Sequence, residues 1–483
     1  MRGAVSAGVT LWLTPVLAVG FHAFNLSLVP SLALGGACAA AIAWVTGGAL
    51  ANALRPALDS RRLAVALVVF AAVAIVSIAR ISVYVADPAR VDCSYTSDPW
   101  RAAHSCMTAY AEAARFASEG THNVYDMSLY EPRRVGPLKV DSYHYPPPFL
   151  LLPAAIRATR ADIFQFRAVW FTLQAVVLAS TLLSIACWIG GRTGACAIVG
   201  AVFAMATPHL VYALQQGNFQ STAVPLAVAA LVLVYAGRAK RGAALLAFTA
   251  ASKIFPGILI VYLLAARRWR ALAWAAAFGA ALLLVSAAAF GTKPFVDFIR
   301  DEVPRISNGA SFPQTERPDT MPSNYSVYGI TVRLRMLGLG WLTEPRGLAI
   351  ASVYGFLVLA LAAFAGWKHA ITLSDPAGRA RLVTVALALV CLASFRSPFI
   401  GVYGLLGTVW LMTLLAARSR TDKGLLGALG LAALFCVAGW LVPGPGHAPT
   451  TIALIVSAMV FLVALCVNVL AVMASPAIVK IST

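Results

Sequence analysis

The sequence predicts an all-α polytopic membrane protein, because it is strongly apolar, carries few charges and has long apolar stretches. Hydrophobic residues make up 60% of the 483 positions and charged residues 11%, whereas a soluble globular domain carries about 25% charged residues. Uncharged apolar stretches of about 18 residues or more recur along the whole chain, and each is long enough for a transmembrane helix. They are continuously apolar, unlike the alternating segments of a β-barrel. The soluble and β-barrel classes are therefore excluded.

The basic residues predict the orientation of these helices. The formal net charge is +19, from 37 Lys and Arg against 18 Asp and Glu. The basic residues cluster in short loops, as they do on the cytoplasmic side of membrane proteins. The clusters are Arg55, Arg61 and Arg62; Arg238, Lys240 and Arg241; Arg267, Arg268 and Arg270; Lys368, Arg379 and Arg381; and Arg418, Arg420 and Lys423. The positive surplus therefore has a membrane explanation, and we expect a membrane partner but no nucleic acid.

With every basic cluster in the cytoplasm, the chain forms about 12 to 14 transmembrane segments. Two stretches, 242–252 and 255–265, would cover only about 17 Å each, too short for a hydrocarbon layer of about 30 Å. The first apolar stretch is expected to be a retained helix, because no cleavage site precedes a soluble domain. Full spans are expected near 5–24, 28–50, 63–86, 164–188, 194–212, 217–237, 270–290, 346–366, 381–395, 399–417, 424–442 and 450–473. Two polar segments, 87–163 and 291–345, then form external loops.

The first external loop, 87–163, concentrates acidic side chains. It holds nine of the 18 acidic residues, and a solvated loop position is a sufficient explanation for any single one. Asp98 differs because it lies between Cys93 and Cys106, which can pair if the loop faces an oxidising compartment. A disulfide would close a loop from residue 93 to residue 106, with a stabilisation of roughly 3 kcal/mol. It would also fix the Asp98 carboxylate in position, as a general base requires.

The same loop contains two further predicted elements. Between Tyr110 and Tyr125, Ala, Phe and Arg recur at helical spacing, and Gly120 is a natural helix stop. The stretch from Pro146 to Pro153 is apolar and interrupted by prolines. It is too short to span, so we expect it to lie against the external membrane surface.

Lys253 lies at the break between the half-helices 242–252 and 255–265. A charge in an apolar region is costly and therefore suggests a function. Near the external face, its ammonium could meet a lipid-linked phosphate as a point charge. The alternative is that Lys253 only extends its ammonium to the surface. We favour a functional role because a broken helix pair departs from the simplest membrane fold.

Other polar residues suit a sugar phosphate. The turn from Gln215 to Gln220 is rich in amides, which hydrogen-bond to sugar hydroxyls but also cap helices. The second external loop, 291–345, offers Arg333 for a phosphate, with Asn324 and Tyr325 for a sugar ring. No P-loop, zinc cluster or dinucleotide fingerprint occurs, and the cytoplasmic loops are too short for a nucleotide site. We therefore expect no cofactor and assign no metal ligand.

Several short motifs follow one another in order. They are Tyr143-His144-Tyr145-Pro146-Pro147-Pro148, Gln216-Gly217-Asn218, Lys253-Ile254-Phe255-Pro256, Arg267-Arg268-Trp269 and Asn324-Tyr325-Ser326. Together with the acidic loop and its Ala-Ala-Arg helix, this series resembles the GT-C-fold glycosyltransferases that use polyprenyl-phosphate sugars, above all glycosyltransferase family 87, the DUF2029 group. The resemblance covers about residues 80–410. It implies a GT-C-like transmembrane bundle at 51–410, with additional helices at 1–50 and C-terminal helices at 411–483.

The resemblance also implies an activity, a hexosyltransferase that acts on the external face of a bacterial plasma membrane. It would move a sugar, with mannose as the family-weighted choice, from a polyprenyl-phosphate donor to a lipid or glycan acceptor. Tyr145, Gln216 and Asn218 match family motifs for substrate binding, and Lys253 matches the Lys-Pro break. An acid of the first external loop acts as the base. Asp98 is the first choice for this base and Asp92 the second.

Two departures from the family pattern affect the site. The family's aspartate lies shortly before the Ala-Ala-Arg element, a position near Cys106 in this chain, and Ser397-Pro398 is followed by Tyr403 without a nearby His. Two other functions remain open. A lipid-linked sugar transporter or flippase would place polar groups near the midplane and often shows inverted repeats. A polysaccharide ligase would act on a lipid diphosphate.

Overall fold

The computed structural model describes residues 1–24, 26–90, 92–93, 102, 104–120, 122–159, 161–312, 318–368, 373–442 and 450–474. Nine helices in these ranges are long and apolar enough to cross a membrane, or ten spans if the bent pair α8 and α9 counts as one. The nine are α1 (Arg2–His22), α2 (Leu28–Leu58), α3 (Arg61–Ala86), α7 (Ile163–Ile189), α13 (Trp269–Phe290), α17 (Glu344–Lys368), α18 (Pro376–Ser394), α20 (Asp422–Leu441) and α21 (Thr451–Met473).

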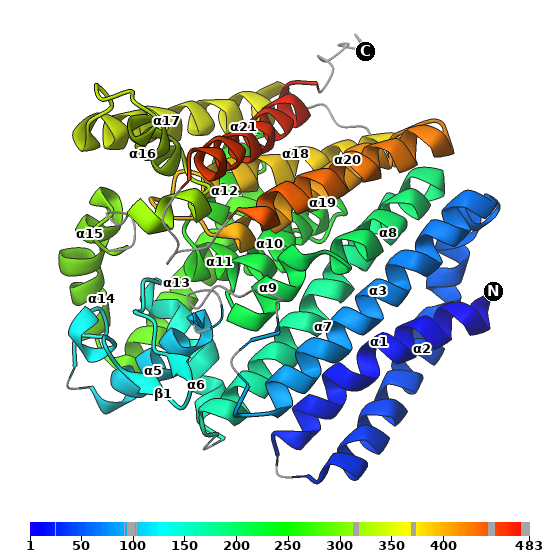
Figure 1. Cartoon of the computed structure of the whole chain (residues 1–483), viewed down its shortest axis with the longest axis horizontal. Coiled ribbons are helices and arrows are strands. Elements are labelled where there is room, and N and C mark those ends of the chain that lie inside the picture. Colours follow the sequence, from blue (N-terminus) through cyan, green and yellow to red (C-terminus); the bar gives the residue numbers. More distant parts are fainter. Residues whose placement is uncertain are drawn as a thin grey trace.

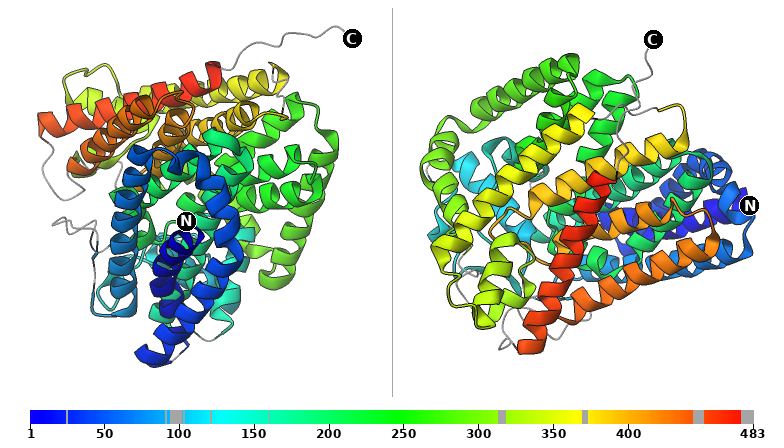
Figure 2. Two further views of the ribbon diagram at one scale, coloured as in Figure 1. Left: turned by 90° about the vertical axis from the view of Figure 1, so that its right-hand side faces the viewer. Right: turned by 90° about the horizontal axis from the view of Figure 1, so that it is seen from above.

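Shorter helices complete the bundle. They are α8 (Gly191–Met205) and α9 (Pro208–Gln216), which meet at 60°, α10 (Gln220–Tyr235), α11 (Ala239–Ser252), η3 (Phe255–Gly257) with α12 (Ile258–Ala265), and η7 (Val402–Leu405) with α19 (Leu406–Ala416). Figures 1 and 2 show the N-terminal helices together on one flank, in blue, and α17 to α21 across another, in yellow to red. The chain is a helical multi-pass membrane protein, as the sequence predicts.

Helix α2 packs against α1 through a stripe of small residues. Its buried positions include Ser31, Gly35, Ala39, Ala43, Gly47 and Ala51, each four residues from the next. Residues four apart share one helix face, and small side chains let helix backbones approach closely in an apolar environment. At Gly35 the helix backbones lie close together, since a Cβ atom there would lie 2.6 Å from the Ala18 backbone nitrogen.

We therefore expect Gly35→Leu to destabilise the protein by about 1–3 kcal/mol, the usual cost of overpacking. Gly36→Leu is the matched control, because a Cβ at Gly36 has only Thr14 Cγ2 nearby, at 3.9 Å. Both substitutions change helix propensity equally, so the difference between their thermal midpoints in detergent reports the α1–α2 contact. Equal midpoints would show that this close approach does not contribute to stability.

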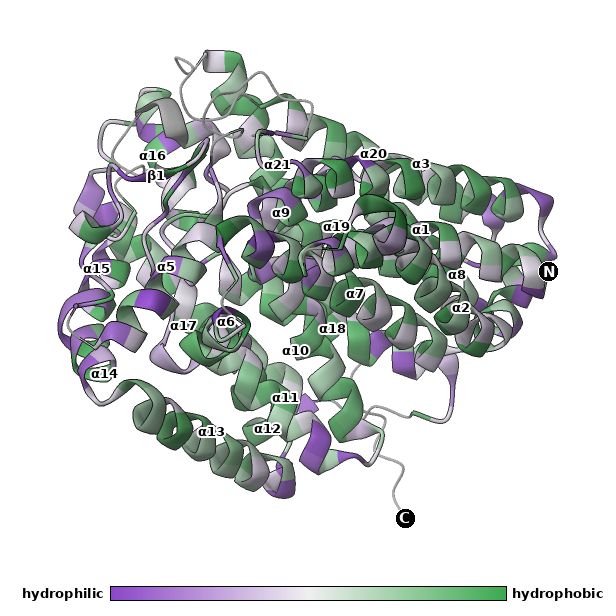
Figure 3. Cartoon of the chain, turned by 90° about the horizontal axis from the view of Figure 1, so that it is seen from below, coloured by the Kyte–Doolittle hydropathy of each residue, from purple (hydrophilic) through white to green (hydrophobic). Residues whose placement is uncertain are grey.

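The two predicted loops, hereafter the first loop (87–163) and the second loop (291–345), gather at one end of the bundle (Figure 1). The first contains α5 (Cys106–Glu119), η1 (Met127–Leu129), the antiparallel strands β1 (Arg134–Val135) and β2 (Leu138–Lys139), η2 (Pro147–Leu150) and α6 (Leu151–Arg157). The second contains α14 (Lys293–Asp297), the π-helix η4 (Phe298–Glu302), α15 (Val303–Asn308), η6 (Pro318–Ser323) and α16 (Val327–Met336). Figure 3 shows hydrophilic residues concentrated around β1, α5, α14 and α15.

Several predicted basic turns meet at the opposite end of the bundle (Figure 1). The Asp422 carboxylate at the start of α20 pairs with Arg192 of α8 and lies close to Arg62 of α3. Arg379 of α18 donates a hydrogen bond from Nε to the carbonyl oxygen of Ile189, at 2.9 Å. Turns far apart in sequence therefore share one end, as expected if their positive charges lie on one side of the membrane.

Candidate active site

A cavity of about 530 Å³ lies between the first loop, the second loop and the break after α11. Its polar wall includes His144, Tyr145, Asn218, Gln220, Lys253 and Arg396. Three residues singled out from the sequence, Tyr145, Asn218 and Lys253, thus come together although up to 108 positions separate them. A polar cavity of this size at the end of an apolar bundle is the natural candidate for a substrate site.

Lys253 lies at the helix break that the sequence predicts. Helix α11 ends at Ser252, and Lys253 takes an extended backbone conformation, with φ −141° and ψ 122°. The chain then enters η3, where Pro256 has no backbone N–H to continue the helical hydrogen bonds. The Lys253 side chain donates a hydrogen bond from Nζ to the Tyr145 hydroxyl oxygen at 3.0 Å, and Nζ lies 4.2 Å from the centre of that ring.

Tyr145 is held by two other tyrosines of the first loop. The Tyr110 hydroxyl donates to the Tyr145 hydroxyl oxygen at 2.8 Å, and the Tyr125 hydroxyl donates to the Tyr145 carbonyl oxygen at 2.9 Å. Burial raises the pKa of Tyr145 well above its ordinary value, so the phenol stays protonated at neutral pH. Since its oxygen accepts from both Lys253 and Tyr110, its own proton is available for donation into the cavity.

The amide turn between α9 and α10 places only one of its two predicted residues on the cavity wall. Asn218 lines the cavity, and its side-chain nitrogen lies 3.3 Å from Cys106 Sγ. Gly217 makes this turn with φ +64°, and its carbonyl oxygen accepts from Trp170 Nε1 at 2.8 Å. Gln216 is fully buried and donates to the Tyr212 hydroxyl, away from the cavity lining.

The predicted residues of the second loop have structural contacts instead. Asn324 donates from Nδ2 to the Pro398 carbonyl oxygen at 2.9 Å, and Tyr325 donates from its hydroxyl to the Gly439 carbonyl oxygen at 3.1 Å. The fully buried Arg333 donates to the Ser457 hydroxyl at 2.9 Å and to the Met321 carbonyl oxygen at 3.2 Å. None of the three lines the cavity. Arg333 therefore holds α16 against α21, and nothing in this arrangement supports its predicted contact with the donor phosphate.

The predicted disulfide between Cys93 and Cys106 is not formed, since both residues are free thiols. Gln215 holds Cys93 by accepting from its backbone nitrogen at 3.0 Å and from its thiol at 3.2 Å. Burial raises the pKa of Cys93 to about 12, so this thiol remains protonated. Cys106 is the first residue of α5 and contacts His104 and Asn218 on the cavity wall. The two sulfurs therefore have separate partners.

The two predicted base residues are not found in the cavity lining. Asp98 lies outside the described residues. Asp92 lies beside Cys93 and near Arg80, and it is not among the lining residues. Asp98 therefore remains a prediction.

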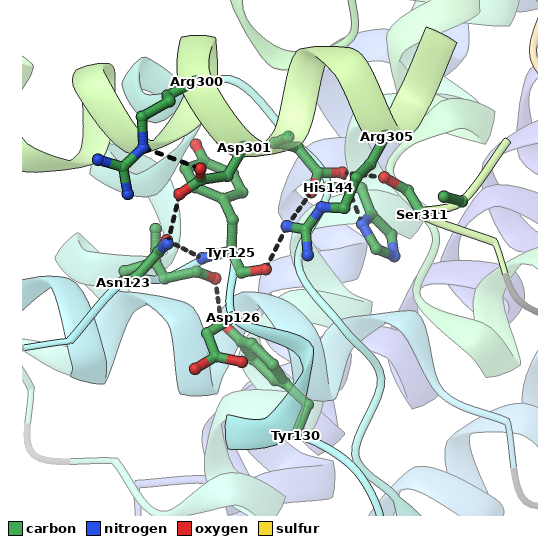
Figure 4. A network of polar contacts seen from close by, with 12 residues as sticks. Asn123, Tyr125, Asp126, Tyr130, His144, Arg300, Asp301, Arg305 and Ser311 are labelled. Carbon is green, nitrogen blue, oxygen red and sulfur yellow. Dashed lines mark hydrogen bonds and ion pairs between the residues drawn. The ribbon is translucent and has the colours of Figure 1, made fainter. Parts of the chain in front are cut away.

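Sequence reasoning missed one histidine–carboxylate pair that joins the two loops (Figure 4). His144 lines the cavity and donates from Nδ1 to Oε1 of the fully buried Glu302 at 2.9 Å. Glu302 also pairs with Arg305 at 2.8 Å and accepts from the Ser311 hydroxyl at 2.8 Å. Beside this group, the Asn123 amide donates to Asp301 at 2.8 Å. The Tyr-His-Tyr motif contained the signal for His144, but its partner is 158 residues away.

A second missed pair is His104 with Asp141, both on the cavity wall. His104 Nδ1 lies 3.1 Å from Asp141 Oδ2. Burial alone would lower the pKa of His104, but the Asp141 carboxylate and the Cys106 thiol beside it raise this pKa to about 10. The imidazole is therefore protonated at neutral pH, so the isolated pair does not provide a free proton acceptor.

These features define a multi-pass membrane protein with a polar cavity built from two loops at one end of its helical bundle. The chain belongs to glycosyltransferase family 87, because its sequence matches the family model over residues 143–394, slightly more than half of its length. The matched region contains His144, Tyr145, Asn218, Lys253 and Glu302. No curated protein matches the chain. The protein is thus a membrane glycosyltransferase.

Proposed function

We propose that this glycosyltransferase takes a hexose from a polyprenyl-phosphate donor and transfers it to a lipid or glycan acceptor at the external face of a bacterial plasma membrane. Lys253 carries the proposal. Its ammonium lies at a helix break, on the wall of a cavity lined by both loops. In its protonated form this lysine can neutralise the charge that develops on a departing lipid phosphate.

The surroundings of Lys253 suit a lipid-linked substrate. Ile254, the next residue, lines the same cavity and is 58% exposed on the surface of the bundle. An apolar side chain at the cavity mouth can face the acyl region of a bilayer, so a polyprenyl chain can remain in the membrane while its phosphate enters the cavity. We propose Arg396, on the same wall, as the second phosphate contact in place of Arg333. Arg396 hydrogen-bonds only to Ser352, at 3.3 Å, and has no ion-pair partner among the described residues.

In the proposed reaction, an acceptor hydroxyl oxygen forms a bond to C1 of the sugar as the bond from C1 to the phosphate oxygen breaks. The electron pair of the broken bond stays on the phosphate, whose charge Lys253 and Arg396 balance. The acceptor proton passes to a base, for which we retain Asp98 as the first choice and Asp92 as the second. Positioning, base catalysis and phosphate stabilisation each contribute to such a step.

His144 is a further candidate for the base. Its Nδ1 donates to the buried Glu302 carboxylate, which leaves Nε2 without a hydrogen-bond partner among the described residues. An imidazole held in this way by a carboxylate has the tautomer and orientation that a general base needs. Its side chain is 17% exposed, and it is a lining residue of the cavity.

Sugar transfer by the purified protein tests the function. We expect radiolabel to pass from polyprenyl-phosphate mannose to a total lipid or glycan extract of the source cell. Asp98→Asn, Asp92→Asn and His144→Gln each remove one candidate base, and the variant that removes the base in use should lower the rate by about 10²–10⁴-fold while the other two do not. If wild type transfers no sugar from any lipid monophosphate but does process a lipid diphosphate, the proposed donor class is wrong and the ligase reading replaces it.

A further inference from the structure

Three side chains with metal-ligating atoms converge on the first-loop side of the cavity. They are His104, Cys106 and Asp141, and one ligand atom of each lies within 4.8 Å of the others. All three line the cavity. All three precede residue 143, where the match to family 87 begins, and the proposed transfer assigns them no role.

We propose that His104, Cys106 and Asp141 bind a divalent transition-metal ion of the zinc type, with a fourth coordination position open to the cavity. Imidazole nitrogen, thiolate sulfur and carboxylate oxygen are the three ligand types that Zn²⁺ takes in proteins. Hard cations such as Mg²⁺ and Ca²⁺ prefer oxygen alone. Three protein ligands and one open position are typical of catalytic rather than structural zinc sites.

The separation of two ligand atoms fits a tetrahedral site. His104 Nε2 and Cys106 Sγ lie 3.5 Å apart. With Zn–S near 2.3 Å and Zn–N near 2.0 Å, two ligands at a tetrahedral angle are about 3.5 Å apart. Asp141 Oδ2 lies 3.1 Å from His104 Nδ1, the other ring nitrogen, and the ligand atoms of all three residues lie within 4.8 Å of one another. To bind the same ion, the Asp141 carboxylate has to turn from Nδ1 towards Nε2 and the Cys106 sulfur.

The cluster is held in place by its neighbours. Thr108 Oγ1 accepts from the Asp141 backbone nitrogen at 3.0 Å and donates to the Lys139 carbonyl oxygen at 3.1 Å. This hydroxyl therefore ties the Asp141 segment to α5, two residues from Cys106. The Asn218 amide, 3.3 Å from the Cys106 sulfur, is a second-layer donor of the kind that tunes metal thiolates.

Binding the ion displaces the thiol proton of Cys106 and the Nε2 proton of His104, which pass to solvent. The ion's open position would then face the same cavity as Lys253 and Tyr145. There it suits an oxygen of the acceptor or of the donor phosphate, whose charge a Lewis acid can stabilise. The site itself does not depend on the proposed donor, because metal binding and sugar transfer are measured separately.

The test is metal binding by the full-length protein in detergent. Protein equilibrated with a small excess of Zn²⁺ and desalted should retain about one equivalent. With Co²⁺ it should show a sulfur-to-cobalt charge-transfer band and the visible bands of a tetrahedral site. Cys106→Ser should abolish the charge-transfer band, and Asp141→Asn should weaken retention. Cys93→Ser is the matched control, since Cys93 is also a buried thiol but does not line the cavity.

Two results would overturn the proposal. One is wild-type protein that retains no zinc and shows no charge-transfer band with cobalt, a result that does not depend on any variant folding. The other is a Cys106→Ser protein, with an unchanged elution profile, whose cobalt spectrum equals that of Cys93→Ser. If transfer is absent while metal is retained, the proposed donor fails and the metal site stands. If transfer is observed while no metal is retained, the metal site is excluded and the proposed donor stands.

Discussion

We expect Lys253→Met to lower kcat/KM for the proposed polyprenyl-phosphate sugar donor by about 10²–10³-fold, the usual effect of removing one preorganised donor to a developing oxyanion. The substitution keeps the length of the side chain but removes the ammonium that donates to the Tyr145 hydroxyl on the cavity wall. Most of the loss appears in kcat, because the phosphate gains charge in the transition state and the lysine acts chiefly there. Initial rates over a range of donor concentrations measure both parameters.

Two controls separate the effect of Lys253 from a general effect of charge. Lys253→Arg keeps a cation and recovers part of the rate, though its planar guanidinium fits a point-charge site imperfectly. Lys240→Met removes a lysine from the other end of the same helix, where Nζ lies 5.0 Å from the Trp274 ring, and leaves the rate unchanged. A correctly folded Lys253→Met protein with the wild-type rate would exclude this lysine from phosphate stabilisation.

Glu302→Ala destabilises the protein by about 3–5 kcal/mol, the cost of removing one partner from a buried charge network. The carboxylate is fully buried and receives contacts from His144, Arg305 and Ser311. Without it, the Arg305 guanidinium and the His144 imidazole lose their buried counter-charge, and the contact between the two loops weakens (Figure 4). Thermal unfolding in detergent measures the loss.

The neighbouring residue provides the control. Asp301 also carries a carboxylate, but its side chain is 27% exposed, it pairs with Arg300, whose side chain is 74% exposed, and it accepts one hydrogen bond from Asn123 of the first loop at 2.8 Å. Asp301→Ala therefore removes a weak ion pair and a single hydrogen bond, and should cost only about 1–2 kcal/mol. Glu302→Gln keeps the shape of the side chain and one acceptor oxygen, so its unfolding midpoint should lie between those of Glu302→Ala and Asp301→Ala. Equal unfolding midpoints for Glu302→Ala and Asp301→Ala would show that the buried network is not what joins the loops.

The sequence was sufficient to predict the helices and one part of the site. Apolar stretches longer than a bilayer specify helices with little ambiguity, and α1, α3, α7, α13 and α21 lie within a few residues of their predicted spans. The Lys253 break was also predictable, because a cation and a proline interrupt two stretches that are each too short to span. Tyr145 and Asn218 came from the order of the family motifs.

The rest of the site could not be predicted, because it depends on contacts between segments far apart in the sequence, and local sequence patterns do not contain that information. Nothing near Arg333 in the sequence shows that its guanidinium binds Ser457 of another helix, 124 residues away. In the same way, the spacing of Cys93 and Cys106 suggests a disulfide, but the Cys93 thiol instead donates a hydrogen bond to the Gln215 side chain. The proposed metal ligands show no zinc-binding motif in the sequence. His104 and Cys106 are neighbours, but the third ligand, Asp141, lies far along the chain, after the end of α5.

The most direct test of the central proposal is a structure of the protein with a polyprenyl-phosphonate sugar, an analogue whose sugar cannot depart. We expect the phosphonate group in the cavity between the two loops, within hydrogen-bond distance of Lys253 Nζ, with the polyprenyl chain leaving past Ile254. A phosphonate bound outside this cavity, or one in the cavity without a contact to Lys253, would contradict the proposal.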